Sequence, residues 1–387
     1  MPAQPEIQGS KETEKRPRFD TIIVFGQGPV KEIKPKNKLT EEERGAWEKF
    51  KKNPRGTEDL DFYAVESKNP KDLEKYQHLG RFALKRLGRF NALAAGYALV
   101  RGQTRELILS GGHTQNKQTR EAREPKLIEF YKENGQEKKI EDYANLSQAQ
   151  KNLMLDDFAA KVVNWPSEAE LMKDVIVRRY AEEYKKKFGR DISEVIKLED
   201  RATNTLENFA LTINKNPDIL SKKVGLLSVN HHLRRILLLA NRFGMDSTKD
   251  DEISAQMELE ERARSRAKKA YDKLMQTNLP EENKWERGEK RWIAGLKEPE
   301  FINYWVGYVS EIKDPAILQR IIGKMNSTEW SQAIRSAFSQ VGLDFGEFEY
   351  EDLIRLQKEN PAKYSELREK LSGLLRFRTL PPESLET

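Results

Sequence analysis

The sequence contains no cysteine, few histidines and no long apolar run, and each shortage excludes a class of protein. Without cysteine there are no disulfides, thiolate nucleophiles or cysteine-ligated zinc sites. The longest apolar run, Ala92 to Val100, is much shorter than the roughly 18 to 20 residues that span a bilayer. Residues 1–18 are polar and lack the apolar segment of a secretory signal. These absences predict a soluble, cytoplasmic protein with no membrane span.

Charged residues are abundant but nearly balanced. Lys and Arg number 69 against 63 Asp and Glu, which leaves a net charge of +6. Proteins that bind nucleic acid usually concentrate their basic residues, whereas this chain has only two short basic clusters, at 15–18 and 185–187. A flexible tail and a solvated helix end account for these clusters. We therefore expect no nucleic-acid partner.

Apolar runs alternate with helical patterns through the first two thirds of the chain. Four short runs predict parallel strands: Thr21–Phe25, Glu106–Leu109, Glu194–Leu198 and Val224–Leu227. We expect an α/β fold, a Rossmann-like three-layer sandwich with a mainly parallel sheet, over residues 19–246. Helical insertions are expected near 34–70 and 117–164, and a disordered leader at 1–18.

Helical patterns continue beyond the predicted sheet. We place a boundary near 245–250 and expect an all-helical C-terminal appendix over 247–387, with helices such as Asp251–Met275 and Asp314–Met325. Its aromatic residues are expected to form a core or a helix-packing interface rather than a stacking surface. They include Trp285, Trp292, Tyr304, Trp305, Tyr308 and Trp330.

Each predicted strand runs directly into a polar cluster. The clusters are Gly26-Gln27-Gly28-Pro29, Ser110-Gly111-Gly112-His113-Thr114, residues 199–205, and Ser228-Val229-Asn230-His231-His232. The carboxyl ends of parallel strands form one edge of an open sheet, and ligands bind in the crevice beside it. We therefore expect all four clusters to meet at one binding site.

Five of these motifs also carry a family resemblance. They are Ile22 to Gly28, Leu109 to Gly112, Ser167-Glu168-Ala169, Glu199 with Thr203 to Asn208, and Ser228 with His232 and Arg235. In order and spacing, residues 18–245 resemble the YdcF/SanA-like family, a domain of unknown function. The resemblance implies a Rossmann-like domain whose polar motifs line one pocket, with envelope-related roles for some members. Many relatives carry an N-terminal membrane anchor, which we do not expect in this chain, and the insertions and appendix lie outside the match.

Two glycine turns suggest a site for an anion. Gly26 and Gly28 follow the first strand, where the lack of side chains lets backbone amides approach a ligand. Ser110-Gly111-Gly112 repeats this design after the second strand. Together they predict a phosphate or carboxylate cradle. The alternative for each is a tight turn without a ligand.

Three residues are candidates for proton transfer. Glu168 lies in the first turn of a helix, where the macrodipole favours a carboxylate in any case, but it shares a stripe with core residues. Glu199 is the first polar residue past its strand and is not needed for capping. His232 belongs to the edge clusters, which contain three of the four histidines. Arg235 lies one helical turn away and can face the same anion.

The remaining candidates have simpler explanations beside the functional one. Asn204 and Glu207 are three apart at a helix start, a spacing that capping explains. His113, His232, Glu168 and Glu199 are metal-ligand types, but no spacing typical of a metal site accompanies them, so we predict none. The candidate ligand-binding residues are Gly26, Gln27, Gly28, Ser110, Gly111, Gly112, His113, Thr203, Asn204, Ser228 and Arg235.

The sequence favours one function and leaves a second open. The first is binding of a small anionic or nucleotide-like ligand at the strand edge. A transferase or hydrolase acting on a phosphorylated or nucleotide-linked substrate fits the same residues. S-Adenosylmethionine or another nucleotide is a conceivable cofactor. The alternative is a non-catalytic ligand sensor or scaffold whose helical C-terminal region recruits a protein partner.

Overall fold

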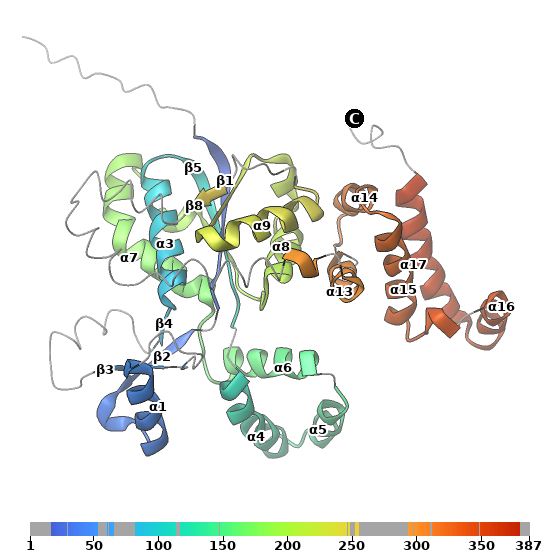
Figure 1. Cartoon of the computed structure of the whole chain (residues 1–387), viewed down its shortest axis with the longest axis horizontal. Helices are drawn as coiled ribbons and strands as arrows, with labels where there is room; N and C mark the ends of the chain where they lie inside the picture. Colours follow the sequence, from blue (N-terminus) through green and yellow to red (C-terminus); the bar gives the residue numbers. More distant parts are fainter. Residues whose placement is uncertain are drawn as a thin grey trace, which may run out of the picture.

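A five-stranded, all-parallel sheet forms the centre of the computed structural model (Figure 1). The structure describes residues 17–28, 30–52, 60, 62–65, 82–113, 117–146, 148–245, 247, 252–254, 293–296, 298–309, 312–347 and 349–379. Apart from residues 17 and 18, the leader expected at the N-terminus lies outside this set. The strands of the sheet are β1 (Phe19–Phe25), β5 (Thr104–Ser110), β6 (Ile196–Glu199), β7 (Val224–Ser228) and β8 (Glu252–Ser254).

The strand order is that of a Rossmann-type sheet. Neighbours follow the order β6-β5-β1-β7-β8, which is 3-2-1-4-5 when the strands of this sheet are counted along the chain. The register pairs Phe25 with Ser110, Ser110 with Glu199, and Val24 with Leu227. The four polar clusters therefore start at one edge of the sheet, as the sequence predicts.

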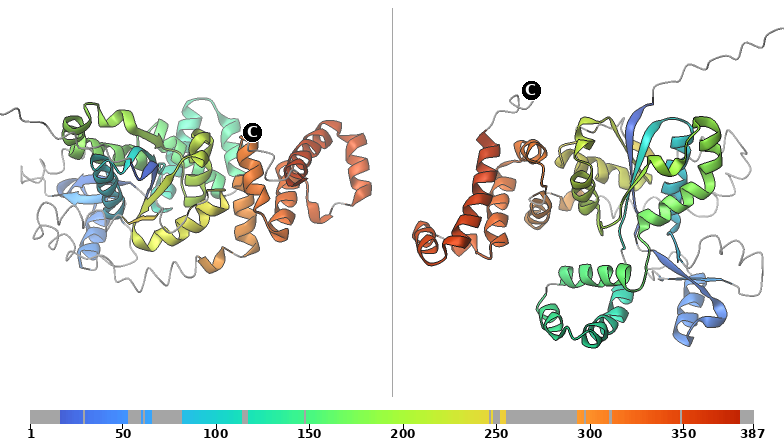
Figure 2. Two further views of the ribbon diagram at one scale, coloured as in Figure 1. Left: turned by 90° about the horizontal axis from the view of Figure 1, so that it is seen from above. Right: turned by 180° about the vertical axis from the view of Figure 1, so that it is seen from behind.

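Two helices cover each face of the sheet. Helices α3 (Arg86–Val100) and α7 (Glu168–Phe188) pack on one face, and α8 (Thr205–Lys215) and α9 (Asn230–Arg242) on the other, as Figure 2 shows from behind. This is the arrangement that right-handed crossovers produce when the strand order reverses once. The Rossmann-like three-layer fold is thus confirmed.

Local sequence signals explain where α7 begins and ends. Ser167 accepts a hydrogen bond from the backbone of Glu170, whose side chain in turn accepts from the Ser167 backbone, and the two bonds form a capping box. Gly189 ends the helix with a φ of 73°, the left-handed conformation that glycine adopts without strain.

Both insertions leave the sheet on the side of the strand carboxyl ends (Figure 1). In the second insertion, the expected helices are α4 (Lys117–Glu133), α5 (Glu137–Ala144) and α6 (Gln148–Lys161). The first holds the expected helix, α1 (Glu41–Lys52), but a small sheet that the sequence does not predict also lies here. Its strands, in the order β3-β2-β4, are β2 (Lys31–Pro35), β3 (Phe62–Val65) and β4 (Phe82–Ala83).

The C-terminal region is helical where it is described beyond residue 293. Its helices are α13 (Pro299–Val309), α14 (Pro315–Gly323), α15 (Ser327–Gln340), α16 (Tyr350–Glu359) and α17 (Pro361–Thr379). Trp305 and Trp330 are buried, as expected for core residues, whereas Tyr304 is 51% exposed. Trp285 and Trp292 lie outside the described residues.

One expectation about this region is wrong. The helix predicted from Asp251 is contradicted at 252–254, which form strand β8 at the edge of the main sheet beside β7. Residues 255–275 of that predicted helix lie outside the described set. The sheet therefore extends beyond the predicted boundary at 246. Among the described residues, we find no helix with both the length and the apolar character needed to cross a membrane.

Candidate functional site

The site lies where the strand order of the sheet reverses, between β1 and β7. The chain progresses from β1 to β5 and β6 on one side, and then crosses to β7 and β8 on the other. In sheets of this type, the crevice outside the carboxyl ends of the two central strands is the usual place for a ligand. The residues that follow β1 and β7 lie at this position of the sheet edge.

A side-chain network bridges this point of reversal. The Gln27 carboxamide, after β1, lies 2.9 Å from Ser228 Oγ at the end of β7. It also lies 3.1 Å from His232 Nδ1, in the first turn of α9. On the other side of the imidazole, Arg235 Nη2 lies 3.1 Å from His232 Nε2. Four residues that the sequence analysis nominated are thus brought together.

Arg235 settles the tautomer of His232 in this arrangement. A guanidinium only donates, so His232 Nε2 must accept, and the neutral ring carries its proton on Nδ1. Nδ1–H must then meet an acceptor, which the Gln27 carboxamide provides when its oxygen rather than its nitrogen faces the ring. With the carboxamide turned in this way, the Ser228 hydroxyl would donate to the same oxygen, in place of the bond in which Gln27 Nε2 donates to Ser228 Oγ. All three contacts are satisfied by this assignment.

Glu168 is buried beneath the turn that follows β1. Its side chain is 3% exposed, and its carboxylate accepts hydrogen bonds from the backbone amides of Gln27 and Gly28, the second at 3.3 Å. Three glycines border the carboxylate. A Cβ on Gly88 would lie 2.9 Å from Oε1 and one on Gly111 3.1 Å from Oε2, while one on Gly26 would clash outright. The carboxylate fills a space that only glycines leave open.

Burial dominates the electrostatics of Glu168. Removal from water raises the pKa of its carboxyl to about 7, against the opposing effect of the two amides and of the nearby Lys85 charge. Lys85 Nζ would lie 3.5 Å from a Cβ on Gly28, so the ammonium is held against the same turn. A carboxyl with this pKa exchanges a proton readily at neutral pH.

The predicted amide cradle is occupied by the protein itself. The amides of Gln27 and Gly28 donate to Glu168, and the Gly26 amide donates to the Ser110 carbonyl at 2.8 Å. The Gly111 amide donates to the carbonyl of Glu199 at 3.0 Å, while Gly112 donates to that of Ala202. The expectation that these amides face a ligand is therefore wrong in this structure, because each has a partner within the chain.

Glycine is required at 112 for another reason. A Cβ there would lie 2.6 Å from the backbone oxygen of Ala202 and 2.7 Å from the carbonyl carbon of Arg201. The loops that follow β5 and β6 cross at this point with their backbones in contact. The tight-turn alternative considered for Ser110-Gly111-Gly112 is thus the one that the contacts support.

Glu199 also has a structural role, which corrects the argument that it is not needed for capping. Its Oε1 accepts from the amides of Arg201 and Ala202 at 2.9 and 3.2 Å, and Ser110 Oγ lies 2.8 Å from Oε2. The Asn208 carboxamide lies 3.0 Å from the same hydroxyl. Burial raises the pKa of Glu199 although these hydrogen bonds oppose the rise. The carboxyl group closes the loop after β6.

Asn204 and Glu207 act as caps, the simpler of their two explanations. Asn204 Oδ1 accepts from the amides of Leu206 and Glu207, both at 3.0 Å. Glu207 Oε2 accepts from the backbone and hydroxyl of Thr203, the hydroxyl at 2.7 Å. All three residues thereby define the start of α8.

The histidines outside this network add no further contact to the Gln27, Ser228, His232 and Arg235 side chains among the contacts described. His113 is partly buried, with Nε2 3.9 Å from Glu170 Oε2 at the start of α7. The side chain of His231, together with Thr114 and Pro29, lies outside what the structure describes. Within the described part of the chain, no three His, Asp or Glu residues are grouped closely enough to hold a metal ion.

Sequence reasoning missed Lys85 and Gly88. Helical spacing of apolar residues extends over residues 72–100 of the sequence, whereas β4 ends at Ala83 and α3 begins only at Arg86. This helix start places Lys85 beside the turn after β1. The available signal was a lysine directly ahead of a glycine-containing helix, which alone is too common to identify a site.

Comparisons with protein-family models, with curated proteins and with solved structures found no match for this chain.

Proposed function

We propose that this chain binds a small anionic ligand, phosphorylated or nucleotide-like, between the carboxyl ends of β1 and β7. One observation carries the proposal: Gln27, Ser228, His232 and Arg235 converge on the point where the strand order reverses. Arg235 and Lys85 supply positive charge on the two sides of the turn that follows β1. Arginine is the side chain best suited to paired hydrogen bonds with a phosphate group.

The start of α9 supports the same location. Its N-cap, Val229, has no side chain that can cap the helix, unlike Ser167 of α7 and Asn204 of α8. Helix N-termini without a side-chain cap attract anions, and the first turn of α9 also contains His232, whose own amide donates to the Val229 carbonyl at 2.9 Å. With the glycine amides already occupied, we assign the anionic group to the α9 side of the crevice.

Glu168 is the residue that we propose for proton transfer. In a phosphoryl transfer, the acceptor hydroxyl would lose its proton to the Glu168 carboxylate as its oxygen bonds to phosphorus. The leaving oxygen would depart with the electron pair of its broken bond, and Arg235 would offset the developing charge. Because Glu168 is 3% exposed, the turn at 26–28 must move before a substrate reaches it. Glu199 is assigned to its loop rather than to catalysis.

Binding of simple probes tests this proposal. Inorganic phosphate, AMP, ADP and S-adenosylmethionine are titrated calorimetrically into the full chain, and hydrolysis of bound nucleotides is followed by phosphorus NMR. We expect at least one probe to bind and Arg235→Gln to weaken it about tenfold or more. The matched control is Arg234→Gln, which removes the same charge from an exposed position on α9.

The outcomes separate the two functions left open by the sequence. Binding with turnover that Glu168→Gln abolishes supports an enzyme. Binding without any turnover supports a ligand sensor instead. If no probe binds, or if Arg234→Gln weakens binding as much as Arg235→Gln, the proposed site is wrong.

A further inference from the structure

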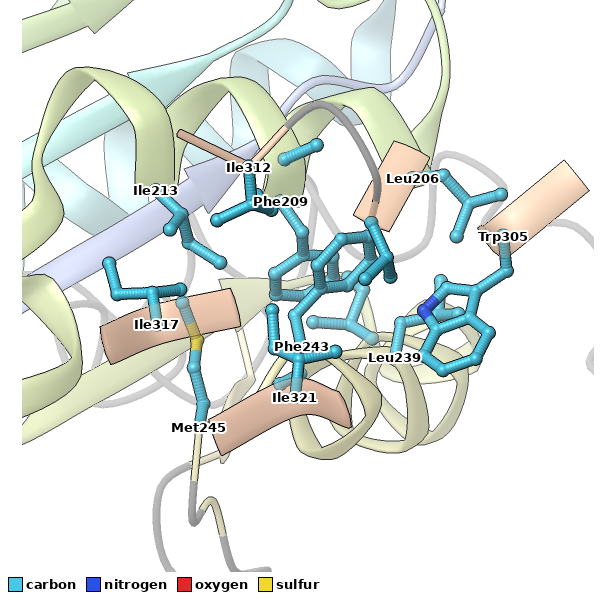
Figure 3. Packing of buried hydrophobic residues seen from close by; sticks show 14 of the residues in the cluster. Leu206, Phe209, Ile213, Leu239, Phe243, Met245, Trp305, Ile312, Ile317 and Ile321 are labelled. Carbon is cyan, nitrogen blue, oxygen red and sulfur yellow. The ribbon is translucent and has the colours of Figure 1, made fainter. Parts of the chain in front are cut away.

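The C-terminal helices are joined to the Rossmann-like domain by a continuous apolar core. Trp305 of α13 packs with Leu206 of α8 and Leu239 of α9, and Ile321 of α14 packs beside Phe243 (Figure 3). These side chains are all at most 3% exposed. The region is therefore docked on the face formed by α8 and α9, and the position of α13 relative to α8 is fixed by packing.

A polar contact sits at one end of this interface. Tyr308, one turn beyond Trp305 on α13, donates through its hydroxyl to Glu207 Oε1 at 2.7 Å. Asn204 Nδ2 donates to the same hydroxyl at 3.2 Å. Burial, followed by the nearby tyrosine hydroxyl and the Glu207 charge, raises the pKa of Tyr308, so the phenol remains a donor. The C-terminal region thus contacts both caps of α8.

A series of hydrogen bonds, mostly between backbone groups, connects Glu207 to Glu168. Glu207 holds the Thr203 amide, and the preceding residue, Ala202, accepts the Gly112 amide through its carbonyl. The Gly112 carbonyl in turn accepts the Glu168 amide at 3.0 Å. Because the Gly112 and Ala202 backbones touch, a shift of the 199–205 loop must move the start of α7.

The second insertion contains a buried carboxyl group, that of Asp156, on which the charge of Glu207 acts. Asp156 of α6 is 4% exposed and paired with Arg120, with Arg120 Nε 3.0 Å from Asp156 Oδ1. Burial raises the pKa of Asp156 to about 6, and the negative charge of Glu207 adds to the rise. Glu207 therefore connects the main domain with the C-terminal helices, and its charge also acts on Asp156 of the second insertion.

We propose that Tyr308 is a positioning residue, through which the C-terminal region holds the 199–205 loop and with it Glu168. This inference rests on the proposed function only for the role given to Glu168. It explains why Tyr308, from outside the Rossmann-like domain, places a half-buried hydroxyl against Glu207, which already accepts hydrogen bonds from Thr203.

Tyr308→Phe tests the inference, because it removes one oxygen and leaves the ring. The control is Tyr304→Phe, whose hydroxyl lies 3.2 Å from that of Tyr308 but belongs to an exposed side chain. In the full-length protein, we expect Tyr308→Phe to accelerate hydrogen exchange at the Thr203 and Gly112 amides about tenfold. Tyr304→Phe is expected to leave both amides unchanged.

A second readout reports on Glu168 itself. Its carboxyl is titrated through the side-chain carbon resonance, with Lys85 and the Gln27 and Gly28 amides as the groups that face it. We expect a lower midpoint in Tyr308→Phe, because a looser α7 start admits water. Glu207→Gln leaves one side-chain oxygen for both Tyr308 and the Thr203 amide, so it should lower the midpoint at least as much.

Unchanged exchange at Gly112, or an unchanged Glu168 midpoint in Tyr308→Phe, would overturn the inference. Neither measurement needs a ligand. Failure of phosphate and nucleotides to bind the wild-type protein would therefore count against the proposed function alone.

Discussion

Replacing Glu168 by glutamine is predicted to change the pH dependence of stability. The unfolded chain has the ordinary carboxyl pKa of 4.5, whereas burial raises the pKa of the folded protein to about 7. The folded state therefore holds the proton more tightly, and this contribution to stability is complete below pH 4.5. It is lost as the pH rises through 7, because the buried carboxyl must then ionise.

The magnitude follows from the two pKa values. Between them, each pH unit lowers the free energy of unfolding by about 1.4 kcal/mol, so the wild type loses about 2.5 kcal/mol from pH 5 to pH 8 through this group. The carboxamide introduced by Glu168→Gln does not titrate, and it retains an oxygen for the Gln27 amide. We therefore expect the variant to gain about 2.5 kcal/mol relative to the wild type over this range.

Urea unfolding at several pH values between 5 and 8, followed by circular dichroism, measures the difference. Every other titrating group is common to both proteins and cancels. The control is Glu182→Gln, which removes an exposed carboxylate from the same helix and should give a flat difference. Parallel curves for Glu168→Gln and the wild type would refute the claim that Glu168 is buried and protonated near neutral pH.

Two further predictions concern the frame of the domain. Glu106 accepts hydrogen bonds from Thr21, Lys197 and Lys222, which lower its pKa to about 2 despite burial. Glu106→Gln should therefore lower the free energy of unfolding by at most about 3 kcal/mol above pH 4.5. In chemical unfolding, this loss should vanish as the pH falls toward 2. An equal loss at pH 3 and pH 7 would contradict the prediction. Gly112→Ala should destabilise the fold by about 3 kcal/mol or more in thermal unfolding, because backbone atoms block the added carbon. Gly45→Ala, in α1 with open space around it, should instead add about 0.5 to 1 kcal/mol, and similar effects at both glycines would refute the steric argument.

Much of the fold was predictable because the central strands are buried on both faces. Such strands appear as unbroken apolar runs, and β1 and β7 were placed to within two residues. The third strand begins two residues later than expected, since Ile192–Val195 forms a 3-10 turn capped by Asp191. Apolar spacing alone does not distinguish such a turn from a strand. β8 has three residues, too few for a pattern.

The candidate site was predictable in place but not in detail. The edge follows from strand direction alone, and the pairing of His232 with Arg235 follows from helical spacing. The partner of the Gln27 amide lies 141 residues further along the chain, so its occupation by Glu168 was invisible to local reasoning. The same holds for Tyr308, which reaches Glu207 from 101 residues away.

Because Glu168 occupies the backbone amides of the turn at 26–28, recognition of the proposed ligand falls to side chains. In a nucleotide-binding sheet whose backbone amides hold the phosphate, the choice of ligand is built into the main chain and changes little with mutation. Here the main chain is committed to Glu168, and the polar groups that border the crevice belong to the side chains of residues 27, 232 and 235. In the proposed site, a few side-chain substitutions would therefore change which ligand is bound, while the backbone that supports the site stays intact.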